Sequence, residues 1–184
     1  SDSLWLASIR PMLDPREFDG DPTSITRIFE RDPELAACYE AVYGAAPVRD
    51  AQRTIVHVGK ALAAFQETLV TGRTPFDDYR DALLRQDAVA MASYPLAALR
   101  GLQLFVGEAA CVSCHSGPNF TDGRFHAVLP GTAVPLGGAD AGRRGGIDKL
   151  RADPLNLMGQ YNDDASKANA AATRALVARK DGQA

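Results

Sequence analysis

The pentapeptide Cys111-Val112-Ser113-Cys114-His115 constrains this chain more than any other feature of its sequence. The pattern C-x-x-C-H is typical of c-type haem attachment, in which two thiols bond to the haem vinyl groups and the histidine binds the iron. One helical turn between the cysteines brings both sulfurs to one edge of the macrocycle. We therefore expect Cys111 and Cys114 to hold a covalent haem c and His115 to ligate its iron.

Three other interpretations of the two cysteines fit the sequence less well. A thioredoxin-like redox pair follows a strand in a βαβ unit, and no strand pattern precedes Cys111. A structural zinc ion takes four ligands, and outside the motif the chain offers only His57, His126 and Cys38 as nitrogen or sulfur donors. A structural disulfide in a helical interaction domain is the third alternative.

Composition is that of an ordinary folded protein and argues against two classes of partner. The 184 residues are 46% hydrophobic and 23% charged, so the length fits one large or two small domains. The net charge of −3 includes no block of one sign, which argues against binding to nucleic acid or to an anionic membrane. No apolar stretch approaches the ~20 residues of a membrane span.

Helix signals recur along the chain, and no window alternates apolar and polar residues as a strand does. Prolines and acids at the starts and glycines at the ends predict helices over 23–43 (a bent pair), 55–69, 75–83 and 95–105. In the helix over 55–69, large apolar residues that include Leu62 and Phe65 share a face that is expected to be buried, and the alanines between them let another helix approach closely. From Pro118 to Gly146, Gly, Pro and Asp indicate a long irregular loop, which either wraps a ligand or is disordered. The sequence predicts an all-α fold.

Three residues outside the motif are assigned to packing. Cys38 lies on the apolar face of its helix and is expected to be a small buried hydrophobe. His57, in an apolar run, is expected to be a hydrogen-bonded core residue rather than a metal ligand. Trp5 is also expected to pack in the core.

The surroundings of the motif resemble the second haem segment of the bacterial di-haem cytochrome c peroxidases. The similar segments are 101–105, 116–122 and Phe125-His126. Val58–Leu69 resembles the helix before that haem, although His57 stands where the resemblance predicts an asparagine. Asp2–Trp5 and Asp14–Glu17 are similar to the stretch between the two haems, notably in the enzymes that mature methylamine dehydrogenase.

The resemblance implies a cytochrome c-like helical haem domain with an irregular haem-wrapping loop. Residues 1–85 would be the helical end of a first cytochrome c-like domain, and residues 86–184 a second one, incomplete at its C-terminus. It further implies an internal fragment of a longer protein that carries two haem c groups, one of them in this chain.

The resemblance also assigns two residues to the first haem. Glu17 matches the carboxylate over the peroxide-binding face, where it can take a proton from one peroxide oxygen and return it to the other. Pro11 matches a proline that lines the same pocket and leaves that haem open. Without the resemblance, Glu17 would be interpreted as a solvated charge in a turn.

The function that the resemblance implies is reduction of hydrogen peroxide with electrons from a small c-type cytochrome or a cupredoxin. The haem on His115 would transfer the electrons, and the isolated fragment would not be active. Thioether attachment outside the bacterial cytoplasmic membrane implies a periplasmic protein, and a homodimer is compatible with the family. The alternative function is a single-haem electron carrier in which Met158 is the sixth ligand of the iron.

Overall fold

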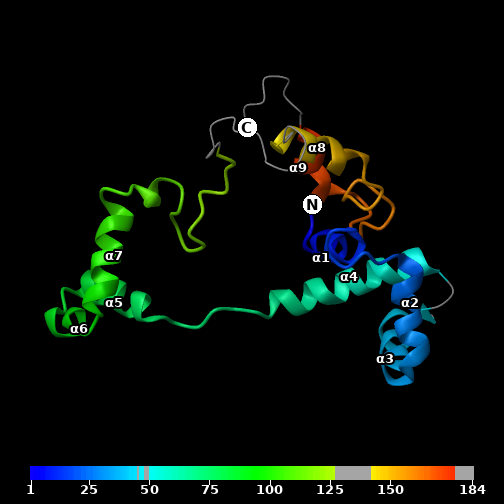
Figure 1. The fold of residues 1–184 in the computed structure, drawn as a ribbon, viewed down its shortest axis with the longest axis horizontal. Coiled ribbons are helices and arrows are strands. Elements are labelled where there is room, and N and C mark those ends of the chain that lie inside the picture. The colour runs from blue at the N-terminus through cyan, green and yellow to red at the C-terminus, as the bar shows by residue number, and fades with distance from the viewer. Residues whose placement is uncertain (45, 48–49, 127–141, 177–184) are drawn as a thin grey trace. The chain divides into compact units, whose positions relative to one another are not determined.

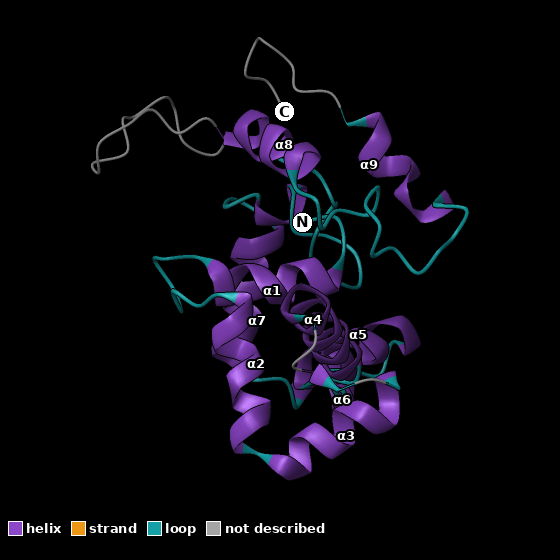
Figure 2. Cartoon of the chain, turned by 90° about the vertical axis from the view of Figure 1, so that its right-hand side faces the viewer, coloured by secondary structure: helices purple, strands orange, loops and turns teal. Residues whose placement is uncertain are grey.

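The computed structural model describes residues 1–44, 46–47, 50–126 and 142–176, and all regular secondary structure in these ranges is helical (Figures 1 and 2). The predicted all-α class is confirmed. The chain forms two compact units, one of residues 1–69 with 131–184 and one of residues 70–130. The boundary predicted between residues 85 and 86 refers to the two cytochrome c-like domains that the resemblance implies, not to these compact units. It stays a prediction.

The first unit contains α1 (Leu4–Leu13), α2 (Pro22–Arg31), α3 (Pro33–Tyr43), α4 (Ala51–Glu67), α8 (Gly142–Ala152), the 3₁₀ turn η3 (Ala168–Ala170) and α9 (Ala171–Ala175). Asp32 ends α2 and begins α3, because its carboxylate accepts a hydrogen bond from the Leu35 amide while Pro33 takes the first helical position. The predicted bent pair over residues 23–43 is confirmed.

The core of the first unit lies where α1 packs on α4. A Cβ atom at Gly59 would lie 2.6 Å from Cγ1 of Ile9 and 2.8 Å from the carbonyl oxygen of Trp5, so only glycine permits this approach. Trp5 is buried there, as predicted.

The buried face of α4 differs from the predicted stripe of large apolar residues. Leu62 and Phe65, predicted to be buried, are 38% and 60% exposed. The face against α1 instead carries Val56, Gly59 and Ala63, because small side chains let two helices approach closely.

The segment that begins with α8 completes this core. Leu150 and Leu155 are buried against α1 and α4, and one Asp2 carboxylate oxygen accepts hydrogen bonds from the Leu157 amide at 2.9 Å and the Thr173 hydroxyl at 2.8 Å. Because α8 begins at Gly142, the irregular loop predicted up to Gly146 ends earlier. Residues 127–141 of that loop lie outside the described residues.

The second unit contains α5 (Pro75–Arg85), α6 (Ala88–Ala92), α7 (Leu96–Val106) and the 3₁₀ turn η2 (Cys111–Ser113). Tyr79 stacks on Tyr94 with ring centroids 4.5 Å apart. None of the side chains of α7 is buried, and Leu96 and Leu104 are more than half exposed. Within the described residues of this unit only Tyr79 and Ala82 are buried, so α7 lacks the buried face that an apolar helix usually has.

Two further findings bear on the sequence predictions. Cys38 is exposed rather than buried, because α3 turns the neighbouring Tyr39 toward α4 instead. Among the residues that the structure describes, no helix is long and apolar enough to cross a membrane.

The close approach at Gly59 predicts that Gly59→Ala destabilises the protein. A methyl group would push against Ile9 and the Trp5 backbone, so we expect the free energy of unfolding to fall by about 1–3 kcal/mol in urea titrations. Gly101→Ala in α7 is the matched control, because nothing lies within 4 Å of the position its Cβ atom would take and alanine favours a helix by up to ~1 kcal/mol. Equal stability of the two variants would contradict the packing described.

Candidate functional site

The C-x-x-C-H motif folds as one tight turn directly after α7. Ala110 adopts a left-handed conformation with φ of 53°, and η2 follows it. The carbonyl oxygen of Cys111 then accepts hydrogen bonds from the amides of Cys114 at 3.3 Å and His115 at 2.9 Å. Both thiols and the imidazole thus come from a single turn, as the motif predicts, and both thiols are free and half-buried.

The imidazole of His115 is oriented by the backbone of the loop that follows. Its Nδ1 lies 3.1 Å from the carbonyl oxygen of Phe120. A carbonyl only accepts, so Nδ1 carries a proton, and in the neutral ring the lone pair is then on Nε2. Gly117, with φ of 73°, allows the turn in which the Phe120 amide donates to the Gly117 carbonyl at 3.1 Å. The ring is held in the tautomer that a metal-binding histidine needs.

A cavity of about 440 Å³ adjoins the motif. Its lining consists of the motif's donors and the polar loop that follows: Ala110, Cys111, Cys114, His115, Thr121, Asp122, Arg124 and His126. Two thiols and an imidazole with a free Nε2 around one cavity fit a haem c. Within the described ranges, no three His, Cys, Asp or Glu side chains are grouped to hold a metal ion by themselves, so the zinc alternative lacks its ligand set there.

Asp122 connects the polar side of this cavity to the motif. Its amide donates to the Cys114 carbonyl at 2.9 Å, and its carboxylate lies 2.9 Å from both the Arg124 amide and Nε2 of His126. The Arg124 amide, followed by His126, lowers the pKa of the Asp122 carboxyl. His126 is therefore engaged by a carboxylate next to the motif.

The loop after His115 also contacts the helices of the second unit. The ring of Phe120 lies 5.9 Å from that of Phe76 at the start of α5 and 6.3 Å from that of Phe105 in α7, between ring centroids. These aromatic contacts fix the loop whose carbonyl orients His115.

Pro11 and Glu17 lie close together in the first unit, on the last turn of α1 and the turn after it. The Phe18 amide donates to the Pro11 carbonyl at 3.2 Å, and the Glu17 amide donates to the Asp14 carbonyl at 2.9 Å. Arg16 pairs in bidentate fashion with Asp14 and lowers the pKa of that carboxyl to about 2, and Glu17 is exposed beside this pair. The catalytic roles of Pro11 and Glu17 stay predictions.

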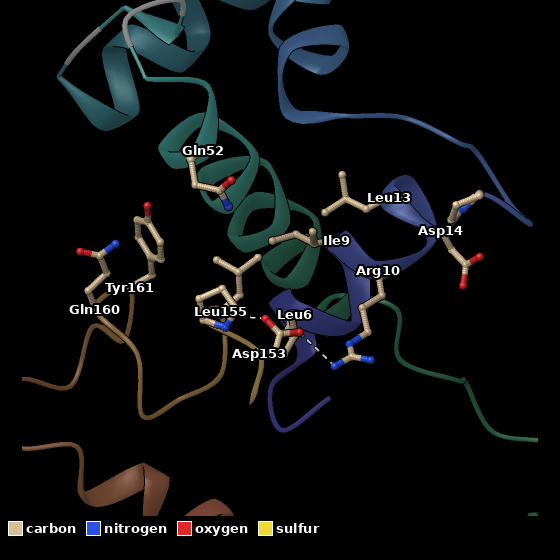
Figure 3. A pocket seen from close by; sticks show the side chains of 12 residues that line it. Leu6, Ile9, Arg10, Leu13, Asp14, Gln52, Asp153, Leu155, Gln160 and Tyr161 are labelled. Atoms are coloured by element: carbon tan, nitrogen blue, oxygen red, sulfur yellow. Dashed lines mark hydrogen bonds and ion pairs between the residues drawn. The ribbon is translucent and has the colours of Figure 1, made fainter. Parts of the chain in front are cut away.

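Sequence reasoning missed a second cavity, of about 730 Å³, in the first unit (Figure 3). Leu6, Ile9 and Leu155 form apolar walls, and Arg10 pairs with Asp153 across 3.0 Å. Nε of Arg10 is buried and has no hydrogen-bond partner in the described part of the chain. The walls come from segments more than a hundred residues apart, so no local pattern could predict this cavity.

His57 is hydrogen-bonded as predicted. Its Nδ1 lies 2.7 Å from the hydroxyl oxygen of Tyr39, and its ring stacks on Tyr43 with centroids 4.0 Å apart. No local pattern in the sequence indicated these two partners, because they lie on a different helix.

Comparisons with known proteins support one family. The family model described as di-haem cytochrome c peroxidase matches residues 1–84. The methylamine utilization protein MauG of Methylorubrum extorquens is 34% identical over 128 residues, which cover 70% of this chain and 33% of the relative. The cytochrome-c peroxidase IdrP1 of Denitromonas iodatirespirans is 38% identical over 96 residues, or 51% of this chain and 22% of the relative.

A third relative is the cytochrome c551 peroxidase of Nitrosomonas europaea, 30% identical over 111 residues, which cover 59% of this chain and 28% of the relative. The chain thus spans about a third or less of the length of these curated relatives. No solved structure matches it. The resemblance found in the sequence is confirmed: the chain is similar to the di-haem cytochrome c peroxidases over residues 1–84, just under half of its length, and to curated relatives over 51–70% of it.

Proposed function

We propose that this chain is part of a di-haem oxidoreductase that reduces hydrogen peroxide, and that it carries the electron-transferring haem c on Cys111, Cys114 and His115. One observation carries the proposal: the Phe120 carbonyl holds Nδ1 of His115, so Nε2 is free beside two free thiols. Similarity to the di-haem cytochrome c peroxidases supports the reaction. The protein would carry two haems, one of them in this chain.

The residues of the motif would hold and tune the haem. A bound haem supplies reversible one-electron chemistry at its iron. Cys111 and Cys114 would fix one edge of the macrocycle through thioether bonds. The hydrogen bond from Nδ1 to the Phe120 carbonyl makes the imidazole of His115 a stronger donor and fixes its ring plane.

At the other haem, Glu17 would hold the proton that peroxide cleavage requires. Its exposed carboxylate lies in the tight turn after α1, in which Arg16 pairs with Asp14. It would take a proton from the near peroxide oxygen and return it to the departing one. Pro11 carries no group that could bind iron, so its place on the same turn would leave the peroxide-binding face open.

The remaining assignments follow from the family. Electrons would come from a small c-type cytochrome or a cupredoxin. Because bacteria attach haem c outside the cytoplasmic membrane, the protein would be periplasmic. A homodimer is compatible with this arrangement.

Covalent attachment predicts which cysteines of the purified full-length protein react with iodoacetamide after denaturation. In a tryptic digest, the peptide 101–124 should keep a haem and stay unalkylated, while Cys38 in the peptide 32–49 should be alkylated. Mass spectrometry separates the two peptides, and Cys38 is the internal control. Double alkylation of the peptide 101–124 would refute haem attachment at the motif.

The haem content of the same material separates the two candidate functions. Pyridine haemochrome absorbance should give two haems per chain. One haem per chain would instead favour the single-haem carrier with Met158 as the sixth ligand.

The role of Glu17 predicts a specific loss in the full-length enzyme. Glu17→Gln keeps the size of the side chain but cannot accept a proton, so kcat for peroxide reduction should fall by about 10²–10⁴-fold. Haem content and the reduction potential of the haem on His115 should not change. Asp19→Asn is the matched control, because Asp19 is exposed in the same turn and its positive φ of 50° suits asparagine. A normal kcat in Glu17→Gln would contradict the assignment.

A further inference from the structure

A buried tyrosine and a histidine form a close pair in the first unit, apart from the residues assigned to the two haems. Tyr39 extends from α3 and is only 8% exposed, and His57 lies on α4. The Tyr39 hydroxyl oxygen and Nδ1 of His57 are 2.7 Å apart. This distance lies within the range over which a proton passes directly between two groups.

The surroundings determine the direction of this hydrogen bond. The Thr54 hydroxyl donates to the Pro47 carbonyl, and its oxygen lies 3.5 Å from the Tyr39 hydroxyl, at the limit of a hydrogen bond. Burial, and then the positive charges of Lys60 and Arg53, lower the pKa of His57. The imidazole is therefore neutral near pH 7. Because the 2.7 Å contact with Nδ1 is much shorter than the 3.5 Å contact with Thr54, we assign the phenolic proton to the shorter one, with Nδ1 as its acceptor.

Aromatic rings enclose the pair. Tyr43 stacks on the His57 ring with a 9° angle between the planes, and its hydroxyl donates to the His57 carbonyl at 2.9 Å. Phe29 meets the Tyr39 ring edge-on, with centroids 5.2 Å apart. His57 also lines a polar cavity of about 310 Å³ together with Lys60 and Asp163. The phenol is shielded, while the imidazole borders a polar space.

We propose that Tyr39 is a redox-active tyrosine, which gives up one electron while its phenolic proton moves to Nδ1 of His57. The products are a neutral tyrosyl radical and an imidazolium, and the oxidant takes the electron. The inference rests on the proposed function, because the oxidant is a haem that peroxide has oxidised. When the electron donor later reduces the radical, the proton returns from His57 to the phenolate oxygen.

The position of the pair in the fold supports this role. Gly59 contacts α1, and His57 precedes it by two residues, about 200° around α4, so the pair lies on the opposite side of that helix. The helix α4 therefore stands between the pair and α1. The helix α1 carries Pro11, which is assigned to the peroxide-binding haem.

The experiment uses the full-length, haem-loaded protein and its Tyr39→Phe and His57→Asn variants. Asparagine places an acceptor oxygen near the position of Nδ1 but cannot take up the proton. Samples frozen within milliseconds of mixing with peroxide are examined by electron paramagnetic resonance, with the haem spectrum recorded in parallel. A second set is oxidised by photogenerated tris(bipyridine)ruthenium(III), which needs no reaction at the haem.

We expect a tyrosyl radical in the unaltered protein, its loss in Tyr39→Phe, and at least a tenfold lower yield in His57→Asn. Tyr79→Phe is the matched control and should keep the signal, because Tyr79 is equally buried but stacks on Tyr94 rather than on a histidine. Circular dichroism checks that each variant folds. If Tyr39→Phe does not fold, the radical yield of His57→Asn tests the inference.

The outcomes separate the two proposals. A haem oxidised by peroxide without a Tyr39-dependent radical, or an undiminished yield in His57→Asn, overturns the inference and leaves the proposed function standing. A haem that does not react with peroxide, together with a Tyr39-dependent radical after ruthenium oxidation, overturns the proposed function and supports the chemistry of Tyr39.

Discussion

The close contact between α1 and α4 at Gly59 organises the first unit. Because Gly59 has no side chain, the Ile9 side chain and the Trp5 backbone pack directly against the backbone of α4. The ammonium nitrogen of the next residue, Lys60, lies 5.8 Å from the centroid of the Trp5 ring and donates to the Tyr161 carbonyl at 2.9 Å. The contact therefore sets both the position of α1, with Pro11 at its end, and the docking of the segment after α8.

The second unit follows a different physical principle. Its motif forms by local hydrogen bonds between residues 110 and 122, and its longest apolar helix, α7, buries none of its side chains. A covalent haem would give such a unit a large apolar surface to pack against, and thioether bonds would keep it there. In the proposed protein the cofactor is thus part of the hydrophobic core of this unit as well as its redox centre.

The sequence predicted the features that depend on neighbouring residues. Caps such as Asp32-Pro33 set the helix starts, and the five residues of the motif already contain all three side chains that are proposed to hold the haem. It failed where distant segments decide the packing. Large apolar residues at positions 62 and 65 suggested the buried face of α4, but the helix that packs there selects the small residues instead. The second cavity was missed for the same reason.

His57 shows how one side chain in a packed site can change what that site is able to do. The family resemblance predicts an asparagine here, which could accept the Tyr39 hydrogen bond and preserve the packing. An imidazole makes the same contact at 2.7 Å, and it can also keep the proton once the phenol has lost an electron. Since an oxidised phenol is far more acidic than a phenol, a nearby base lowers the cost of removing that electron. If the proposed enzyme stores oxidising equivalents, Tyr39 would give one of them a defined place, in a buried site next to a polar cavity that screens the excess charge.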